Sequence, residues 1–365
     1  MSEDKKNVNF YMPINKGQFH LDTDERIELF EKNRGSDDPE GYKEYRRQWF
    51  ENPKKFLLAE YPLHVDIELA SVCNLKCPMC YTITPQFKEK VNAKLMDFEL
   101  YKKIIDEIGP AGVYSIRLSL RGESFLHKKI IDCIRYAKEK GIREISTLTN
   151  GVRLDEKMFR EALDAGLDWL TISFDGIGET YERIRKPAKF DQMVKKIANF
   201  QKIKKEVGRV KPVIKVQSIL PAIRDCIEEY YNTFQQITDQ VSSNPLIDYL
   251  QMDGLDKLEF EDNFSCPQLY ERLVIGADGI VMMCSNDEEN EYPVGNANSQ
   301  TIYDIWHGEH MTKAREVHKR FEGVKEYGIC RKCYIPRKTE PEELKVNGRT
   351  VLAENYTNRS QLIGS

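Results

Sequence analysis

Between residues 64 and 252, short β-prone segments alternate with helical segments, and this alternation constrains the fold of the 365-residue chain most. Strands that alternate with helices form right-handed βαβ units and a parallel sheet. Six such units predict an α/β fold built as a partial (β/α)6 barrel, with ligand chemistry at the carboxyl ends of its strands. The predicted strands are His64–Val72, Val113–Leu120, Glu144–Thr149, Trp169–Phe174, Val213–Leu220 and Ile247–Met252. The predicted helices are Phe98–Ile108, Lys128–Lys140, Glu156–Ala165, Tyr181–Ile184 with Phe190–Val207, and Ile223–Ser242.

Segments without this strand–helix alternation flank the core on both sides. We predict a helical N-terminal extension over residues 1–60, the barrel over 61–255, a small cysteine-containing domain over 256–340 and a polar tail over 341–365. In the extension, Glu40–Lys55 has the pattern of one amphipathic helix that caps a barrel end or covers an active site. The small domain carries a hairpin pattern (Leu273–Ile275 and Ile280–Met283 around an Ala-Asp-Gly turn) and a helix over Thr301–Phe321.

Charge and hydropathy exclude several partners. The net charge of -4 and pI of about 6.0 give no basis for binding nucleic acid or an anionic membrane. No apolar run reaches the ~18 residues of a membrane span, and the polar N-terminus lacks the core of a signal peptide. We therefore expect a cytoplasmic protein. Because that compartment keeps thiols reduced, the nine cysteines indicate metal binding or chemistry rather than disulfides.

Three cysteines follow directly on the first predicted strand. Cys73, Cys77 and Cys80 are spaced C-x3-C-x2-C. Three thiolates in one loop can hold three corners of a [4Fe–4S] cluster and leave the fourth iron open. That iron could chelate the amino and carboxylate groups of S-adenosylmethionine, whose reductive cleavage gives a 5′-deoxyadenosyl radical. Zinc with a distant fourth ligand and buried apolar cysteines are the alternatives. The usual zinc pattern has two CxxC pairs, and this segment does not.

At these residues the sequence resembles the radical SAM superfamily, whose signature is C-x3-C-x-aromatic-C. Met79 stands in the aromatic position and joins the cofactor-binding residues that the resemblance implies. Residues 120–124 (Leu-Arg-Gly-Glu-Ser) stand where the family often has Gly-Gly-Glu-Pro. Gly122 and Glu123 match this motif, whereas Arg121 and Ser124 depart from it. The resemblance covers roughly residues 62 to 337.

Three further matches follow later strands. Thr149-Asn150-Gly151 resembles the family's Thr-Asn-Gly, which touches the ribose region, although Asn-Gly is also a common turn dipeptide. Ser173, in Ser-Phe-Asp-Gly, resembles the Ser of Ser-Leu-Asp-Gly and is a candidate donor to the cofactor. Arg185 stands where relatives place an arginine for the cofactor carboxylate, and Arg183 fits by spacing equally well. The order of these motifs at successive strand ends carries the resemblance.

A second cysteine group, Cys266, Cys284, Cys330 and Cys333, resembles the SPASM/Twitch auxiliary-cluster domain. Full SPASM domains have seven cysteines, and no cysteine follows Cys333, so the four-cysteine Twitch pattern fits better. The resemblance implies one fully ligated auxiliary [4Fe–4S] cluster with an electron-transfer or structural role. Four thiolates also suit tetrahedral zinc, which is the alternative at this site.

Three residues on or just after the fifth predicted strand are candidates for substrate chemistry. Cys226, just past strand five, could give a hydrogen atom to a substrate radical or be an inert thiol. Lys215 and Gln217 alternate with Val216 along that strand and are candidate substrate contacts at the barrel mouth. Cys133 lies in a helical pattern and is predicted to be core.

These features favour an oxidoreductase that dehydrogenates a carbinol carbon of a sugar, nucleotide sugar or aminocyclitol. The auxiliary cluster would accept the second electron, and an external flavodoxin or ferredoxin would supply the first. The resemblance to Twitch-type dehydrogenases supports this hypothesis. The alternatives are a radical epimerase of a sugar or peptide with Cys226 as hydrogen donor, a peptide- or protein-modifying enzyme, and a non-catalytic zinc protein.

Overall fold

A ten-stranded sheet organises the structure. The computed structural model describes residues 10–14, 16, 19–247, 257–358, 361 and 363. The strand order is β1-β7-β6-β5-β4-β3-β2-β8-β9-β10, and the sheet stays open with β1 and β10 at its edges. Strands β2 to β7 run parallel in chain order. The strand bounds are β1 Phe19–His20, β2 His64–Ile67, β3 Ser115–Arg117, β4 Glu144–Thr149, β5 Trp169–Ser173, β6 Val213–Ile219, β7 Gln240–Asn244, β8 Arg272–Ile275, β9 Ile280–Met282 and β10 Pro293–Asn296.

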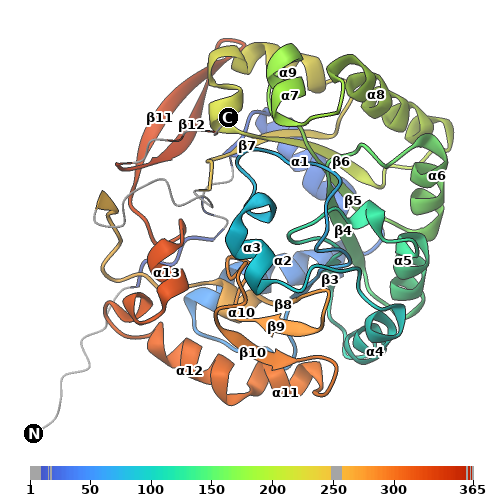
Figure 1. Ribbon diagram of the computed structural model, residues 1–365. Helices are drawn as coiled ribbons and strands as arrows, with labels where there is room; N and C mark the ends of the chain where they lie inside the picture. Colours follow the sequence, from blue (N-terminus) through green and yellow to red (C-terminus); the bar gives the residue numbers. More distant parts are fainter. Residues whose placement is uncertain are drawn as a thin grey trace, which may run out of the picture.

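Helices that follow the strands cover the outer face of this partial barrel (Figure 1). They are α4 Phe98–Ile108, α5 Ile130–Glu139, α6 Glu156–Ala165, α7 Gly178–Ile184, α8 Phe190–Glu206 and α9 Ile227–Phe234. Helix α3 Pro85–Lys90 lies instead at the centre of the view in Figure 1, inside the ring of helices. Their sequences explain their form. In α4, Asp97 caps the first turn, and Tyr101, Ile104, Ile105 and Ile108 make one buried stripe at helical spacing. The predicted mixed α/β fold with a partial parallel barrel is confirmed.

The last repeat differs from the prediction. The helix expected over Ile223–Ser242 ends at Phe234, and Gln240–Asn244 forms the sixth parallel strand β7. Its polar sequence, Gln-Val-Ser-Ser-Asn, lacks the apolar run by which a buried strand is recognised. It is nevertheless a buried strand because it pairs with β6 on one side and β1 on the other. Of the predicted strand Ile247–Met252, residues 248–252 lie outside the described residues.

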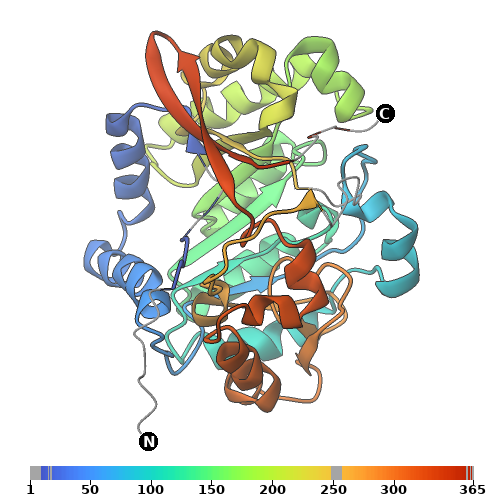
Figure 2. The same cartoon turned by 90° about the vertical axis from the view of Figure 1, so that its left-hand side faces the viewer.

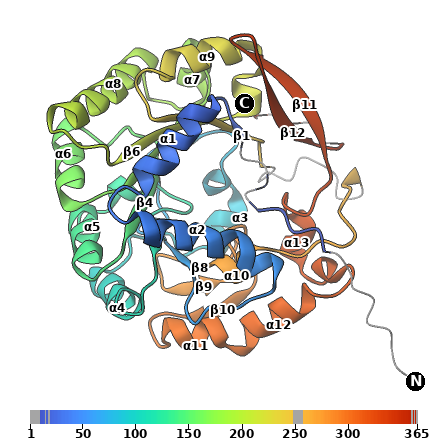
Figure 3. The same cartoon turned by 180° about the vertical axis from the view of Figure 1, so that it is seen from behind.

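Two N-terminal helices close the end of the barrel at which the parallel strands begin (Figure 3). They are α1 Asp24–Arg34 and α2 Pro39–Lys54. Arg34, at the end of α1, makes an ion pair with Glu144, the first residue of β4. Tyr45 of α2 stacks on Tyr114, just before β3, with ring centroids 4.7 Å apart. Of the two predicted roles of residues 40–55, the cap over a barrel end is the observed one.

The C-terminal part extends the same sheet. Strand β8 pairs in parallel with β2, and β9 and β10 follow antiparallel. The helix predicted over Thr301–Phe321 is broken at Gly308, whose extended backbone separates α11 Ile302–His307 from α12 Glu309–Val317. The two short helices α10 Gln268–Glu271 and α13 Gly328–Lys332 carry or flank cysteines. Because the sheet runs through the predicted boundary near residue 256, the division into domains stays a prediction.

The polar tail contributes a hairpin that the sequence did not indicate. Strands β11 Thr339–Val346 and β12 Arg349–Tyr356 pair antiparallel over their whole length. Figures 1 and 2 show the hairpin (red) along one side of the molecule between α9 and α13. Arg349 donates to the backbone carbonyls of Leu21 and Asp22 and so ties the hairpin to the segment after β1. None of the helices in the described ranges has the length and apolar character needed to cross a membrane.

Candidate functional site

The C-x3-C-x2-C loop leaves β2 at the carboxyl ends of the parallel strands, as predicted. Cys73 is exposed, Cys80 is half-buried and Cys77 is buried. The backbone folds around the sulfurs, because the amide of Leu75 donates to the Cys73 Sγ at 3.4 Å and the amide of Cys80 donates to the Cys77 carbonyl at 3.0 Å. Asn150, after β4, also donates to the Cys73 Sγ at 3.8 Å. The loop is therefore fastened to the neighbouring strand end.

The three thiols influence one another electrostatically. Burial raises the pKa of Cys77 to about 11, although the Arg185 guanidinium acts in the opposite direction. Burial also raises the pKa of Cys73, and the Glu123 carboxylate and the Cys80 thiol add to that shift. Metals bind the thiolate form, so a bound cation would have to offset the free-energy cost of deprotonating these thiols.

Glu123 links two of the predicted cofactor motifs. Its carboxylate accepts from the Thr149 hydroxyl and from the Asn150 amide, both at 2.7 Å. The Asn150 side chain in turn donates to the Asn74 Oδ1 at 2.9 Å. Burial raises the pKa of Glu123. The Gly-Glu and Thr-Asn-Gly segments and the cysteine loop are thus one connected structure, and Glu123, Thr149 and Asn150 are brought together as the resemblance implies.

Gly122 allows the cysteine loop to approach this structure. A Cβ at position 122 would lie 2.3 Å from the Ala70 carbonyl oxygen and 2.5 Å from that of Val72. Next to it, the amide of Glu123 donates to the Val72 carbonyl at 2.9 Å. The glycine is therefore required by the packing of backbone on backbone just before Cys73.

We predict that Gly122→Ala destabilises the protein and lowers its capacity to hold iron at the first cysteine loop. The added methyl group must push the backbone of residues 70–72 away, and such overpacking typically costs about 1–3 kcal/mol. Urea unfolding and iron analysis measure both effects. Gly112→Ala is the matched control, because a Cβ there meets nothing within 4 Å, although its positive φ of 82° adds some strain. Equal iron content in both variants would contradict the prediction.

Arg121, which departs from the family motif, has a role of its own. Its guanidinium pairs with Glu68 of the segment after β2, with contacts of 2.8 Å from Nε and 2.6 Å from Nη2. Its Nη1 donates to the Glu288 carbonyl and the Asn290 side chain. The second Glu68 oxygen also accepts from the Ala277 amide at 3.1 Å. A buried ion pair therefore joins the motif loop to the C-terminal part of the chain.

The remaining predicted cofactor residues lie around the same strand ends. Arg185 pairs with Asp175, with 2.8 Å from its Nε to Oδ2, and faces Cys77 closely enough to lower its pKa. Arg183 is exposed, so the structure favours Arg185 of the two. Ser173 ends β5 and is partly exposed, whereas Met79 is buried in the core. Their contacts to a cofactor stay predictions.

The second cysteine group gathers around one cavity. The cavity encloses about 360 Å³, part of it continuous with solvent, and all four of its cysteines line it. Apolar side chains such as Leu269 and Ile329 make up much of the rest of the wall. Burial raises the pKa of Cys266 to about 12 and that of Cys333 to about 11, and it holds the pKa values of Cys284 and Cys330 well above the ordinary value of a thiol. His318 also lines the cavity, with its Nε2 3.7 Å from the Cys330 Sγ.

The ligand types that line this cavity bear on which metal group it could hold. In the described part of the chain, no three Cys, His, Asp or Glu side chains converge on the position of a single metal ion. A cubane distributes its thiolates around four irons, whereas tetrahedral zinc draws its ligands together around one ion. Four thiols that line one largely apolar cavity have the chemistry to hold a [4Fe–4S] cluster, and the same donors also suit zinc.

Cys226 lies where the sequence placed it, beyond the carboxyl end of β6. It ends a short 3-10 helix, Arg224–Cys226, and is half-buried. Burial raises the pKa of its thiol, so the protonated form predominates at neutral pH. Its predicted role as hydrogen donor stays a prediction.

Comparison with known proteins identifies this arrangement. Residues 67–218 match the model of the radical SAM superfamily, and residues 266–334 match that of SPASM, an iron–sulfur cluster-binding domain. The chain therefore contains a radical SAM domain followed by a SPASM domain. A radical SAM domain carries a [4Fe–4S] cluster and S-adenosylmethionine, and a SPASM domain carries auxiliary iron–sulfur clusters. The three-cysteine loop and the four-cysteine cavity lie within the two matched ranges.

Proteins similar to this radical SAM enzyme carry names that differ in activity. The Fe-coproporphyrin III synthase of Methanosarcina barkeri is 33% identical over 160 residues, which cover 43% of this chain and 39% of that protein. BtrN in complex with AdoMet and 2-DOIA superposes with a TM-score of 0.54 at 19% identity, covering 74% of this chain and 92% of that one. Streptococcus suis SuiB bound to the precursor peptide SuiA superposes with a TM-score of 0.51 at 16% sequence identity. The match covers 81% of this chain and 76% of that one. The chain spans about two fifths of the length of the curated relatives it matches first, and the structural likenesses show the fold alone.

Proposed function

We propose that this radical SAM enzyme is an oxidoreductase that dehydrogenates a carbinol carbon of a small, sugar-like substrate. When bound, the two kinds of cluster and S-adenosylmethionine supply a 5′-deoxyadenosyl radical for hydrogen abstraction and an acceptor for the second electron. The chain's own part is to hold the reactants in place. The cysteine loop, Glu123 and Asn150 form one bonded structure at the strand ends, which fixes where hydrogen abstraction would occur.

The four-cysteine cavity carries the proposal. All four cysteines line one cavity, so a cluster there would have a protein ligand for each iron and no iron left for substrate. Such a site suits electron transfer, which a dehydrogenation needs and a simple hydrogen exchange does not. Strand β8 pairs directly with β2, so the segments that carry the two cysteine sites are joined through one sheet.

The polar inner face of the barrel supports a hydroxyl-rich small molecule. Thr171 and Gln217 occupy register positions on that face. Hydroxyl and amide groups match the donors and acceptors of a sugar. Peptide substrates, like the SuiA peptide on SuiB, remain the rival class to be tested.

We predict that Cys330→Ser separates radical formation from oxidation. Reconstituted, reduced protein is incubated without oxygen with S-adenosylmethionine and sugars deuterated at each carbinol carbon. The native chain should transfer deuterium into 5′-deoxyadenosine and form a ketone two hydrogens lighter. The variant should form 5′-deoxyadenosine but little ketone, because it lacks one auxiliary ligand. Cys133→Ser, in α5, is the control outside both cysteine sites.

Two results would redirect the proposal. Substrate recovered with inverted configuration and a solvent deuteron, lost on Cys226→Ala, would establish the epimerase instead. Ketone formation that survives Cys330→Ser unchanged would remove the auxiliary site from the reaction and with it the main support for dehydrogenation.

A further inference from the structure

The inner face of the barrel has two halves that differ in how their polar groups are satisfied. Residues directly opposite one another in register share a face. Starting from β2, the inner face presents His64 and Asp66, then Ser115 and Arg117, then Glu144 and Ser146. It continues with Trp169 and Thr171, Lys215 and Gln217, Gln240 and Ser242, and finally His20. The opposite face, with Ile145, Leu170, Ile172, Ile214 and Val216, is apolar and fully buried.

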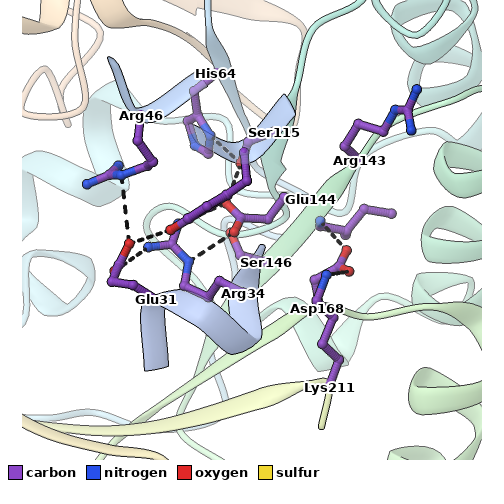
Figure 4. A network of polar contacts seen from close by, with 12 residues as sticks. Glu31, Arg34, Arg46, His64, Ser115, Arg143, Glu144, Ser146, Asp168 and Lys211 are labelled. Atoms are coloured by element: carbon purple, nitrogen blue, oxygen red, sulfur yellow. Dashed lines mark hydrogen bonds and ion pairs between the residues drawn. The ribbon is translucent and has the colours of Figure 1, made fainter. Parts of the chain in front are cut away.

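The half formed by β2, β3 and β4 is satisfied by the protein itself (Figure 4). Arg34 donates to both oxygens of Glu144 at 3.0 Å, and the Ser115 hydroxyl donates to the same carboxylate at 3.0 Å. His64 bridges Ser115 and Asp66, again at 3.0 Å. Asp66 also pairs with Arg117 at 2.8 Å. Each of these buried charges therefore has a partner of opposite sign.

In the half formed by β5, β6, β7 and β1, several buried polar groups have no hydrogen-bond partner among the described residues. Lys215 is 2% exposed, yet its ammonium makes no ion pair or hydrogen bond with any described residue. The Trp169 ring lies beside it, with the ring centroid 5.9 Å from the Lys215 Nζ. The indole N–H of Trp169, the His20 Nδ1 and the Ser242 hydroxyl are likewise buried without a partner in the described part of the chain. Buried polar groups are normally hydrogen-bonded, so such a group of exceptions requires an explanation.

Lys215 is the buried cation of this half, and the Glu31 and Asp22 carboxylates, which pair with Arg34 and Arg26, act on its pKa in the upward direction. Arg34 lies close enough to Lys215 to lower its pKa, although burial is the larger cause, and the pKa falls to about 8. The ammonium therefore remains mostly protonated at neutral pH. His20 is neutral there, because burial lowers its pKa to about 4 and Lys215 adds to the shift. A buried, unpaired ammonium is costly, and an anion is the ligand that removes this cost.

The position suits a substrate whose reacting carbon lies at the strand ends. Gln217 is level with Ser173, the candidate cofactor contact at the end of β5. Lys215 lies two residues deeper, about 7 Å at a rise of ~3.3 Å per residue. A molecule of sugar size can span this depth with one end at the cofactor and the other at Lys215.

We propose that Lys215 and the indole N–H of Trp169 form a subsite for an anionic group of the substrate, a carboxylate or a phosphate. The proposal rests on the proposed function, since it names the substrate class of that reaction. It favours sugar acids, sugar phosphates and nucleotide sugars, whose charge complements Lys215. It disfavours aminocyclitols, because their ammonium groups would lie beside another buried cation.

Lys215→Met tests the subsite through binding and stability together. Binding of glucuronate, glucose 1-phosphate and inorganic phosphate is measured by calorimetry on the reconstituted protein with S-adenosylmethionine bound, with glucose as the neutral probe. We expect the native chain to bind at least one anion more tightly than glucose. Lys215→Met should weaken that binding about 10- to 100-fold, as expected for a hydrogen bond to a charged group. Lys215→Arg should retain most of it, and the three anions distinguish carboxylate from phosphate.

Thermal unfolding without anion separates this role from a structural one. Lys215→Met should raise the Tm, because it replaces an unpaired buried charge with an apolar side chain of similar length. Trp169→Phe should weaken anion binding about 2- to 10-fold by removing one donor while keeping most of the ring. The proposal is overturned if Lys215→Met lowers the Tm, or if no anion prefers the native chain over this variant. Oxidation of a neutral sugar would overturn the anionic subsite but leave the proposed dehydrogenase function intact. Anion binding without formation of any ketone would overturn the dehydrogenase function but leave the anionic subsite intact.

Discussion

Replacing Cys77 by alanine is expected to abolish formation of 5′-deoxyadenosine and to halve the iron content of the reconstituted protein. Two cubane clusters correspond to roughly eight irons and eight sulfides per chain. Cys77 is the most buried of the three loop thiols, and the loop backbone turns back on itself at its carbonyl. Its loss leaves two thiols for a cluster that needs three, while the four-cysteine cavity is unchanged.

The measurement combines iron and sulfide analysis, the visible absorption spectrum and chromatography of 5′-deoxyadenosine. Cys133→Ala is the matched control, because Cys133 is buried in α5 and lies in neither cysteine group. Should Cys77→Ala unfold, the exposed Cys73→Ala gives the same test with less cost to packing. Retention of all eight irons and of S-adenosylmethionine cleavage would refute the assignment of the loop. A colourless native protein with zinc at both sites would refute it as well.

The sequence predicted the parts of the fold that follow from periodicity. Strands β4 to β6 and helices α4, α6 and α8 begin and end within a residue or two of their predicted bounds, because apolar residues recur at strand or helix spacing. Strand β7 was missed because Ser242 and Ser243 are buried by pairing rather than by apolar character. The hairpin of β11 and β12 was missed for a similar reason, since its exposed face is rich in Glu and Lys.

The site shows the same division. Spacing located the three-cysteine loop, and the resemblance to the radical SAM superfamily and its auxiliary-cluster domain located Gly122, Glu123 and the second cysteine group. Neither gave a reason for Arg121, whose partner Glu68 is 53 positions away in the chain. The contrast between the two halves of the barrel interior also needed the structure. It depends on which of Glu144, Asp66 and Lys215 find partners on other strands, and single-sequence patterns do not contain that information.

Arg121→Met is expected to lower the free energy of unfolding by about 3–5 kcal/mol, the range for breaking one side of a buried ion pair. The side chains of Arg121 and Glu68 are 2% and 0% exposed. Without the guanidinium, the Glu68 carboxylate keeps only the backbone amides of residues 121 and 277 as donors. Because Arg121 also holds Glu288 and Asn290, the variant should loosen the segment after Cys284 and expose it to limited proteolysis.

Urea unfolding of matched variants separates this effect from a general loss of arginine. Arg135→Met breaks the exposed pair with Asp132, whose side chains are about half exposed, and should cost less than about 1 kcal/mol. Adding Glu68→Gln to Arg121→Met should recover part of the loss, since it removes the uncompensated charge. If Arg121→Met and Arg135→Met had the same free energy of unfolding, the ion pair of Arg121 with Glu68 would not stabilise the contact between the barrel and the C-terminal part of the chain. The two cysteine sites would then be held together by the pairing of β2 with β8 and by contacts such as those of Lys103 and Glu107 with residues 297–303. A shift in the spectrum of the auxiliary site in Arg121→Met would not be expected.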